Sequence, residues 1–185
     1  MKYLITALTL FTALPAFAND QSGGIYVGAE LSGATLELSE ESEFDLVSRL
    51  DGDLGAAFSL GYKWSNNWAA ELRGSFSTNT DGLGILPDVT LSQAQILFGH
   101  NFRVTEKLEF VPMIGWSSWT LSTTESRLFR SSEPETNSID GNDFFVRVGL
   151  DYQLTKNTTF TSYYTRSDFG VLEANEFAFG LRLKY

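Results

Sequence analysis

The stretch FFVRVGLDYQL, residues 144–154, decides the fold of this chain. Bulky apolar or aromatic side chains occupy every second position, and Arg147 and Asp151 lie between them. This period of two is the pattern of a β-strand with one apolar and one polar face. The stretch therefore predicts a strand, and Thr155-Lys156-Asn157 predicts the turn that ends it.

The same alternation recurs in both directions from this stretch, and no segment places apolar residues at helical spacing. We predict eight strands, at residues 25–32, 54–64, 68–76, 93–102, 108–117, 144–154, 160–165 and 176–185. The pattern slips phase near Gly33, and the seventh strand is too weak for its two faces to be assigned. Pro112 in the fifth strand predicts either a bulge or a lost ladder hydrogen bond.

Short and long connections alternate along the chain. Short turns are expected near Asn66, Glu106 and Lys156, and long polar connections at residues 39–53, 79–88, 122–142 and 167–174. All short turns then fall at one end of an up-and-down meander, and all long connections fall at the other. The predicted fold class is all-β, an eight-stranded antiparallel up-and-down transmembrane β-barrel.

The composition excludes several other classes of protein. The 185-residue chain has no cysteine, so a disulfide scaffold is impossible. Its apolar share of 43% argues against intrinsic disorder. The 13 Lys and Arg against 23 Asp and Glu give a net charge of −10, so we expect no nucleic-acid partner. The length fits one domain.

The first residues have the pattern of a secretory signal. Lys2 is followed by an apolar run from Leu4 to Leu14, and Ala16-Phe17-Ala18 supplies the small residues of a cleavage site. A retained membrane helix is the weaker interpretation, because a spanning helix needs roughly 20 apolar residues. We therefore divide the chain into a signal peptide at residues 1–18 and a barrel domain at residues 19–185.

Alternation alone does not say which face of the barrel is outside. The polar face carries glycines and charged residues, and an eight-stranded barrel is only wide enough for side chains to fill it. The bulky face would overfill that space, so we expect it outside, in lipid. Aromatic residues near strand ends, such as Trp64 and Trp68 at one end and Phe76 and Trp116 at the other, predict two interfacial girdles. A secreted soluble barrel of lipocalin type is the alternative.

Several stretches carry a resemblance to a known family: Gly24-Ile25-Tyr26-Val27-Gly28, Gly61-Tyr62-Lys63-Trp64, Gly149-Leu150-Asp151-Tyr152 and Gly180 to Tyr185. In them the chain resembles the small outer-membrane β-barrels, which include the transmembrane domain of outer membrane protein A and OmpX- and Ail-like proteins. The resemblance implies a Gram-negative outer membrane protein, surrounded by lipid and lipopolysaccharide, and we expect a monomer. It also implies a C-terminal signal for the barrel-assembly machinery at Phe177, Phe179, Gly180, Leu181, Leu183 and Tyr185.

The charges on the inward face predict an ionic network. Because an unpaired charge is costly in a water-poor interior, we expect pairing among Glu30, Glu71, Arg73, Arg147, Asp151 and Arg182. Such a network would hold the strands of a filled barrel together. A gated ion path through the same residues is the alternative, and bilayer conductance separates the two.

The long connections carry most of the acidity. The first of them crowds together Glu40, Glu41, Glu43, Asp45, Asp51 and Asp53. Hard divalent cations prefer clustered carboxylates, so this group, or Asp140-Gly141-Asn142-Asp143, could bridge calcium or magnesium to lipopolysaccharide phosphates. No spacing matches a calcium loop, and a solvated, charge-repelling surface is the favoured interpretation. We predict no metal site and no cofactor.

An enzyme is the rival class of function, since a few barrels in this membrane act on lipid A. Such catalysis generally needs a histidine beside a serine or a carboxylate. The only histidine, His100, lies on the apolar face. We therefore predict a non-enzymatic protein with a structural, membrane-integrity or surface-binding role through acidic extracellular loops, whose ligand is unknown. A small channel and a lipid A-modifying enzyme are the alternatives.

Overall fold

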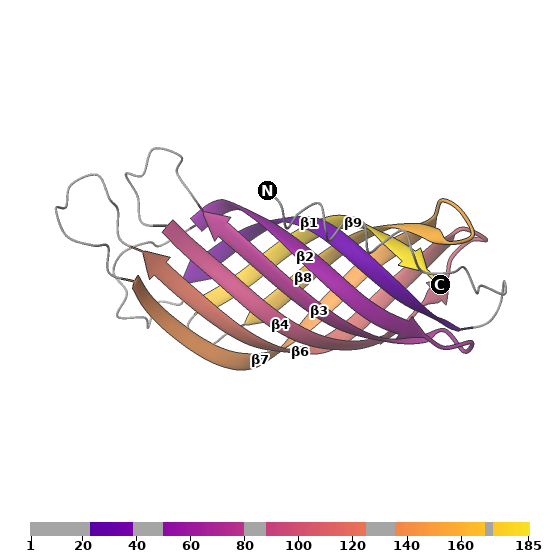
Figure 1. Ribbon diagram of the computed structural model, residues 1–185, viewed down its shortest axis with the longest axis horizontal. Coiled ribbons are helices and arrows are strands. Elements are labelled where there is room, and N and C mark those ends of the chain that lie inside the picture. The colour runs from indigo at the N-terminus through magenta and orange to yellow at the C-terminus, as the bar shows by residue number, and fades with distance from the viewer. Residues whose placement is uncertain (1–22, 39–49, 80–87, 125–135, 169–171) are drawn as a thin grey trace, which may run out of the picture.

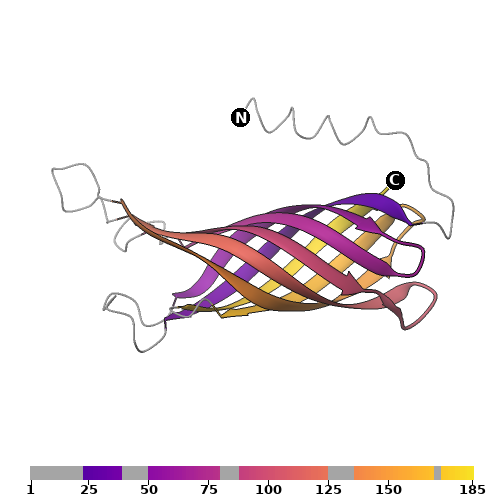
Figure 2. The same ribbon diagram turned by 90° about the horizontal axis from the view of Figure 1, so that it is seen from below.

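The protein is a closed antiparallel β-barrel (Figures 1 and 2). The computed structural model describes residues 23–38, 50–79, 88–124, 136–168 and 172–185, so the expected signal peptide at residues 1–18 lies outside the described residues. The strands are β1 (Gly24–Leu38), β2 (Leu50–Lys63), β3 (Trp68–Asn79), β4 (Asp88–His100), β5 (Phe102–Arg103), β6 (Leu108–Thr124), β7 (Thr136–Gln153), β8 (Thr158–Asp168) and β9 (Leu172–Lys184). The described residues form no helix long and apolar enough to cross a membrane.

Hydrogen bonding joins each strand to its neighbours in sequence, except that β4 and β5 do not pair with each other, and β1 pairs with β9 to close the sheet. That closing ladder runs from Tyr26 opposite Lys184 to Leu38 opposite Leu172. Both β4 and β5 pair with β6, so these two segments occupy one position in the barrel. The barrel therefore has eight strand positions, which confirms the predicted fold class.

The break between β4 and β5 lies opposite Pro112. The ladder with β6 stops at Gly99 opposite Met113 and resumes at Phe102 opposite Phe110, in the same register. Proline has no N–H to donate at the missing rung. Of the two outcomes expected for this proline, the structure shows the lost ladder bond and no bulge.

The three short turns lie at one end of the barrel, together with the C-terminal end of β9 (right side of Figure 1). Each leaves four residues between strands, at 64–67, 104–107 and 154–157. Two of them have the same construction, because the hydroxyl of Thr105 or Thr155 accepts hydrogen bonds from the backbone N–H groups two and three residues later. In the first turn Asn67 adopts a positive φ of 66°, which asparagine tolerates.

Strands at the opposite end reach further than the sequence predicted. The ladder between β6 and β7 continues from Ser117 opposite Asp143 to Thr124 opposite Thr136, and only residues 169–171 separate β8 from β9. The predicted connections at 122–142 and 167–174 were therefore too long. Apolar alternation marks only the part of a strand with lipid on one side, whereas backbone pairing continues beyond it.

The bulky apolar face points outward, with Leu31 72% exposed and Phe144 81% exposed. Strand β8, whose faces the sequence left open, turns Phe160, Ser162 and Tyr164 outward and Thr161, Tyr163 and Thr165 inward. The phase slip expected near Gly33 is absent, because alternation of buried and exposed residues continues through that glycine. The irregularity is a register shift against β2 between Ala34 and Thr35.

The inward face is less uniformly small and charged than its sequence suggested, because aromatic rings also point inward. Each of the four buried aromatic residues among those described lies directly opposite a glycine of the neighbouring strand. The pairs are Tyr26 with Gly61, Trp119 with Gly141, Phe145 with Gly115, and Tyr163 with Gly149. A Cβ on any of these glycines would lie within 2.5 Å of the opposing ring. The glycines therefore provide space for rings as well as for ionic side chains.

Candidate functional site

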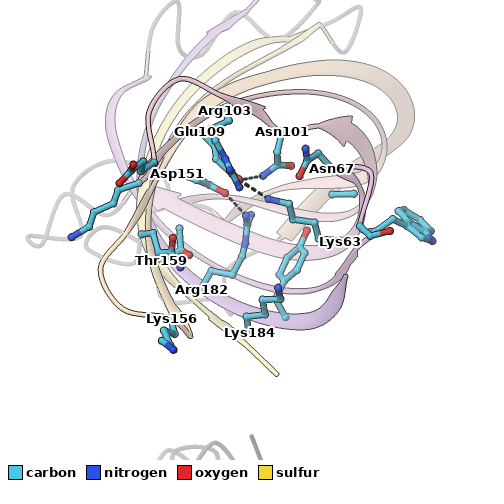
Figure 3. A pocket seen from close by; sticks show the side chains of 17 residues that line it. Lys63, Asn67, Asn101, Arg103, Glu109, Asp151, Lys156, Thr159, Arg182 and Lys184 are labelled. Carbon is cyan, nitrogen blue, oxygen red and sulfur yellow. Dashed lines mark hydrogen bonds and ion pairs between the residues drawn. The ribbon is translucent and has the colours of Figure 1, made fainter. Parts of the chain in front are cut away.

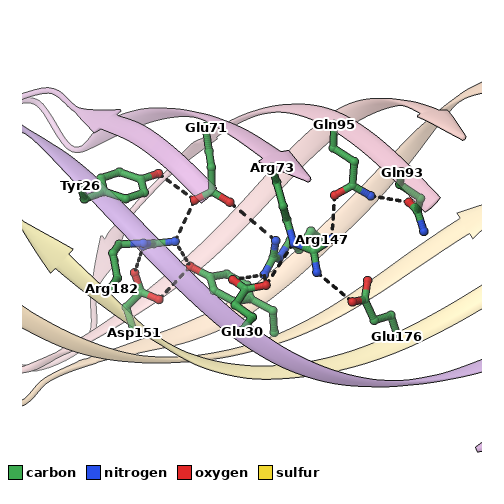
Figure 4. Close-up of polar contacts among 11 residues, drawn as sticks. Tyr26, Glu30, Glu71, Arg73, Gln93, Gln95, Arg147, Asp151, Glu176 and Arg182 are labelled. Carbon is green, nitrogen blue, oxygen red and sulfur yellow. Dashed lines mark hydrogen bonds and ion pairs between the residues drawn. The ribbon is translucent and has the colours of Figure 1, made fainter. Parts of the chain in front are cut away.

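An ionic network occupies the interior, and it contains all six residues predicted for it (Figure 4). Glu30 comes from β1, Glu71 and Arg73 from β3, Arg147 and Asp151 from β7, and Arg182 from β9. Residues two or four apart on one strand share a face, which places both members of the β3 and β7 pairs inside. All six side chains are buried.

Glu30 is the centre of one half of the network. Both of its carboxylate oxygens accept hydrogen bonds of 2.7 Å from Nη2 of Arg147, and one accepts from Nε of Arg73 at 3.1 Å. Arg73 also donates to Glu176 and to Gln95, each at 2.8 Å. Glu30 therefore compensates two buried guanidinium groups at once.

Arg182 is the centre of the other half. It donates to Asp151 at 2.6 Å and to Glu71 at 3.0 Å, and its guanidinium carbon lies 4.3 Å from the centre of the Tyr26 ring. The hydroxyl of Tyr26 donates to Glu71, and that of Tyr163 donates to Asp151. Each acidic group here accepts from more than one donor, as a buried charge requires.

Four members of this network were missing from the predicted set: Tyr26, Gln95, Tyr163 and Glu176. Tyr26 and Glu176 alternate in phase with Glu30 and Arg182, so strand parity alone could have found them. Tyr163 lies on the strand whose faces the sequence did not assign. Hydroxyl and amide groups carry no charge, and so a search for charge pairs passes over them.

Apolar side chains fill the rest of the interior. One buried cluster consists of Leu97, Val111, Met113, Phe145 and Tyr163. A second, of Leu91, Trp119 and Ala174, lies toward the end away from the short turns. Arg147 and Glu71 at mid-height are almost completely buried. These side chains fill the centre of the barrel, as expected for eight strands.

The interior opens at the short-turn end into a cavity of about 480 Å³, shown in Figure 3. We call it the short-turn cavity. Its wall includes Lys63 and Glu109, which form an ion pair of 2.7 Å, and Asn101, which donates to the same carboxylate at 2.7 Å. Arg182 and Asp151 of the ionic network also line it. Strand parity also placed Lys63, Glu109 and Lys184 on the inward face, whereas Arg103, Lys107 and Lys156 were not singled out from the sequence.

The acidic cluster predicted in the first long connection is divided by the structure. Glu40, Glu41, Glu43 and Asp45 lie outside the described residues. Asp51 and Asp53 belong to strand β2, opposite Thr35 and Ala34, and this corrects their placement in a connection. Asp140 to Asp143 likewise belong to β7, where successive side chains point to opposite faces. Across the described residues, no group of three or more acidic or histidine side chains could hold a metal ion.

Most of the remaining predicted residues lie on the outer face, whereas Gly180 lies on the inward face opposite Glu30. Phe177, Phe179 and Leu181 of the expected C-terminal assembly signal are exposed on β9, with Gly180 between them. His100 packs between Trp68 and Phe102, with ring centres 5.0 and 4.5 Å away. Trp68 in turn stacks on Phe98 at 5.0 Å. His100 is thus part of an aromatic girdle near the short turns.

Comparison with known proteins matches this architecture. The family model for the outer membrane protein beta-barrel domain matches residues 4–184. Neisserial surface protein A has a TM-score of 0.70 at 16% identity, with 89% of this chain and 99% of that chain covered. Ail, the attachment invasion locus protein of Yersinia pestis, has a TM-score of 0.63 at 13% identity with the same coverages.

OprG from Pseudomonas aeruginosa has a TM-score of 0.55 at 14% identity, with 89% of this chain and 96% of that chain covered. A search of curated protein sequences gave no match. At these identities the solved structures show a shared fold, whereas the family model spans nearly the whole chain. The chain therefore belongs to the outer membrane protein beta-barrel domain family, and it is an integral protein of the Gram-negative outer membrane.

Proposed function

We propose that this chain is a non-enzymatic outer-membrane protein that binds a partner at the cell surface, through the polar extension of the barrel beyond the bilayer. The observation that carries this proposal is the β6–β7 extension, which is the part of the ladder from Ser117 opposite Asp143 to Thr124 opposite Thr136. Phe144 on β7 and Trp116 on β6 lie opposite each other and are the last bulky apolar residues on the outer face. Beyond them, both strands leave the lipid.

The outer face of this extension is polar. Ser118, Thr120, Asp140 and Asn142 are exposed there, at positions where lipid-facing strands carry large apolar groups. Inside, Trp119 donates from Nε1 to Asp143 at 2.9 Å and packs with Leu91. The extension is therefore an ordered sheet presented to solvent.

One backbone edge of the extension supports a binding role. From Thr136 to Phe144, β7 pairs with β6 on one side, and among the described residues it has no partner strand on the other. Unpaired N–H and C=O groups on a strand edge can accept an extended segment of another protein. This edge could therefore bind an extended segment of a partner protein without a deep pocket.

Charge restricts the class of partner. Ail has been solved in complex with the heparin analogue sucrose octasulfate, which is a polyanion. In this chain, residues 39–49 contain Glu40, Glu41, Glu43 and Asp45 against Arg49 alone. Acidic connections repel polyanions, so the proposed partner presents a basic or neutral protein surface.

Shortening the extension tests the surface-binding role. Replacing residues 121–139 with Asn-Gly joins the opposed Thr120 and Asp140 through a two-residue turn that suits a hairpin. We expect cells that express this variant to lose adhesion to cultured epithelial cells. The barrel itself should remain heat-modifiable on gels, because the strands within the lipid are unchanged.

A matched control shortens residues 80–87 to Asn-Gly and leaves β6 and β7 intact. We expect that variant to adhere as the unaltered chain does. Full adhesion by the 121–139 variant, with both proteins equally folded in the outer membrane, contradicts the surface-binding proposal.

The ionic network favours a structural role over a channel. Because buried side chains fill the interior of the barrel at mid-height, we expect the purified protein in planar bilayers to show no stable, frequent channel openings. The variant Arg182→Ala, which removes the partner of Asp151 and Glu71, provides the comparison. Frequent openings in the unaltered chain that Arg182→Ala abolishes would establish a gated path instead.

The position of His100 argues against lipid A catalysis. Its ring packs on Trp68 and Phe102 in the girdle near the short turns, whereas lipopolysaccharide occupies the leaflet at the opposite end. A histidine in this place anchors the barrel at the membrane interface, as other amphipathic rings do.

A further inference from the structure

The short-turn cavity has the opposite charge balance to the rest of the chain. Six of the 13 Lys and Arg line it, but only three of the 23 acidic residues do. The basic residues come from four parts of the barrel: Lys63, Arg103 and Lys107, Lys156, and Arg182 and Lys184. In a protein with a net charge of −10, this is a concentrated region of positive charge.

Two of the three acidic groups are already compensated. Glu109 accepts two hydrogen bonds from Lys63, at 2.7 and 2.8 Å, and one from Asn101. Asp151 accepts from Arg182 and from Tyr163. Glu106 is the third acidic residue of the wall.

Two of the basic side chains form no ion pair in the part of the chain that the structure describes, although Arg103 lies opposite Glu109 in the β5–β6 ladder. No acidic side chain there lies within ion-pair distance of Arg103 or Lys107. Both are exposed toward the opening, one at each end of the turn between β5 and β6. The cavity therefore has positive charge available to a ligand.

The turn that carries these two residues is ordered before any ligand arrives. Val104 and Thr105 donate backbone hydrogen bonds to Leu108 at 2.8 and 3.1 Å, and the backbone oxygen of Lys107 accepts from Gln153 at 2.8 Å. The bond from Gln153 ties the turn to the end of β7. A backbone turn that is held in place before binding reduces the entropy lost on binding.

From this arrangement we propose that the short-turn cavity binds a small multivalent anion, one that carries two or more phosphate groups and enters from the periplasmic side. Short turns of outer-membrane barrels face the periplasm. The blind inner end, closed by the Arg182 pairs, limits the occupant to a molecule that fits about 480 Å³. Arg103 and Lys107 at the opening, with Lys63 on the wall, supply donors to its oxygens.

Calorimetry with tripolyphosphate tests the proposal on the full chain in zwitterionic nanodiscs. We expect saturable binding that weakens as salt is raised, because the contacts are solvent-accessible charges. The double variant Arg103→Gln and Lys107→Gln should bind roughly five- to tenfold more weakly. Amide NMR signals of Asn67, Asn101 and Lys156 should shift on titration, and those of β6 and β7 beyond Trp116 should not.

The matched control is Arg166→Glu, which changes the net charge by the same two units on the exposed outer face of β8. We expect it to bind as the unaltered chain does. The proposal is overturned in favour of a general charge effect if this control loses as much affinity for tripolyphosphate as the double variant does. NMR shifts spread over the whole barrel would overturn it in the same way.

The phosphates could belong to a soluble molecule or to an anionic lipid headgroup at the rim. Nanodiscs that contain cardiolipin, whose headgroup carries two phosphates, distinguish these sources. If the anionic lipid weakens tripolyphosphate binding, and this effect depends on Arg103 and Lys107, the cavity binds a lipid headgroup. If tripolyphosphate binds equally well in both kinds of nanodisc, the cavity binds a soluble ligand. Absence of binding in both kinds of nanodisc overturns the proposal.

Discussion

Replacing Glu30 with alanine is expected to lower the free energy of unfolding of the barrel by about 3–5 kcal/mol. The substitution removes the acceptor of two hydrogen bonds from Arg147 and one from Arg73. Among the described residues, Nε and Nη1 of Arg147 make no hydrogen bond, and its next acidic neighbour, Glu71, lies 3.7 Å away. Arg147 would therefore be left as a buried charge with weak compensation.

Urea titration of the protein folded in detergent micelles measures this loss, with the mobility of unboiled samples as the readout of the folded barrel. The control is Glu173→Ala, which removes an ion pair of 3.3 Å with Arg166 on the exposed face. Exposed pairs contribute about 0–1 kcal/mol, so the control should change little.

If Glu30→Ala does not fold, Glu30→Gln provides a measurable variant of nearly the same shape. We expect it to be less stable than the unaltered chain, because a neutral amide compensates neither guanidinium. Stability equal to that of Glu173→Ala for both substitutions would show that the network does not stabilise the barrel.

Replacing Gly115 with alanine is expected to cost about 1–3 kcal/mol, through overpacking. The added Cβ would lie 2.3 Å from Cζ of Phe145 and 2.5 Å from its Cε1. The ring is fully enclosed by Leu97, Val111, Met113 and Tyr163, and it cannot move aside without displacing that cluster.

A second substitution tests whether the ring is the cause. In a Phe145→Leu background, Gly115→Ala should cost at least about 1 kcal/mol less, since leucine leaves the space that the Cβ needs. Gly74→Ala is the matched control, because its added Cβ meets no atom within 4 Å. Equal costs for Gly115→Ala in both backgrounds would exclude a clash with Phe145.

The fold could be predicted from the sequence because each strand in lipid must carry apolar residues at every outward position. Every outward residue from Phe144 to Leu154 must be apolar, so parity alone placed Arg147 and Asp151 inside. Pairing could then be inferred, since a buried guanidinium needs a carboxylate. The same rule does not apply beyond Trp116 and Phe144, where the outer face of the sheet is polar, and this explains why the β6–β7 ladder was underestimated.

The short-turn cavity could not be predicted for a different reason. Lys63, Arg103, Lys107 and Lys156 come from separate turns and strand ends, and a sequence does not show that their side chains meet at one opening. Local charge is also misleading there, because Glu106 and Glu109 lie within two residues of Lys107 in the chain. Only closure of the barrel brings the basic residues together.

The pairing of inward rings with glycines also favours one alignment of neighbouring strands over a shifted one. Tyr163 fits opposite Gly149, but a slip of two residues between β7 and β8 would place its ring opposite Arg147 or Asp151. Inward and outward faces would be preserved in such a slip, so lipid could not correct the error. A slipped register would lose the space that glycine gives the ring, and ring and glycine pairs of the same kind occur at β1–β2 and β6–β7. These pairs therefore distinguish two registers that the alternation of apolar and polar residues leaves equivalent.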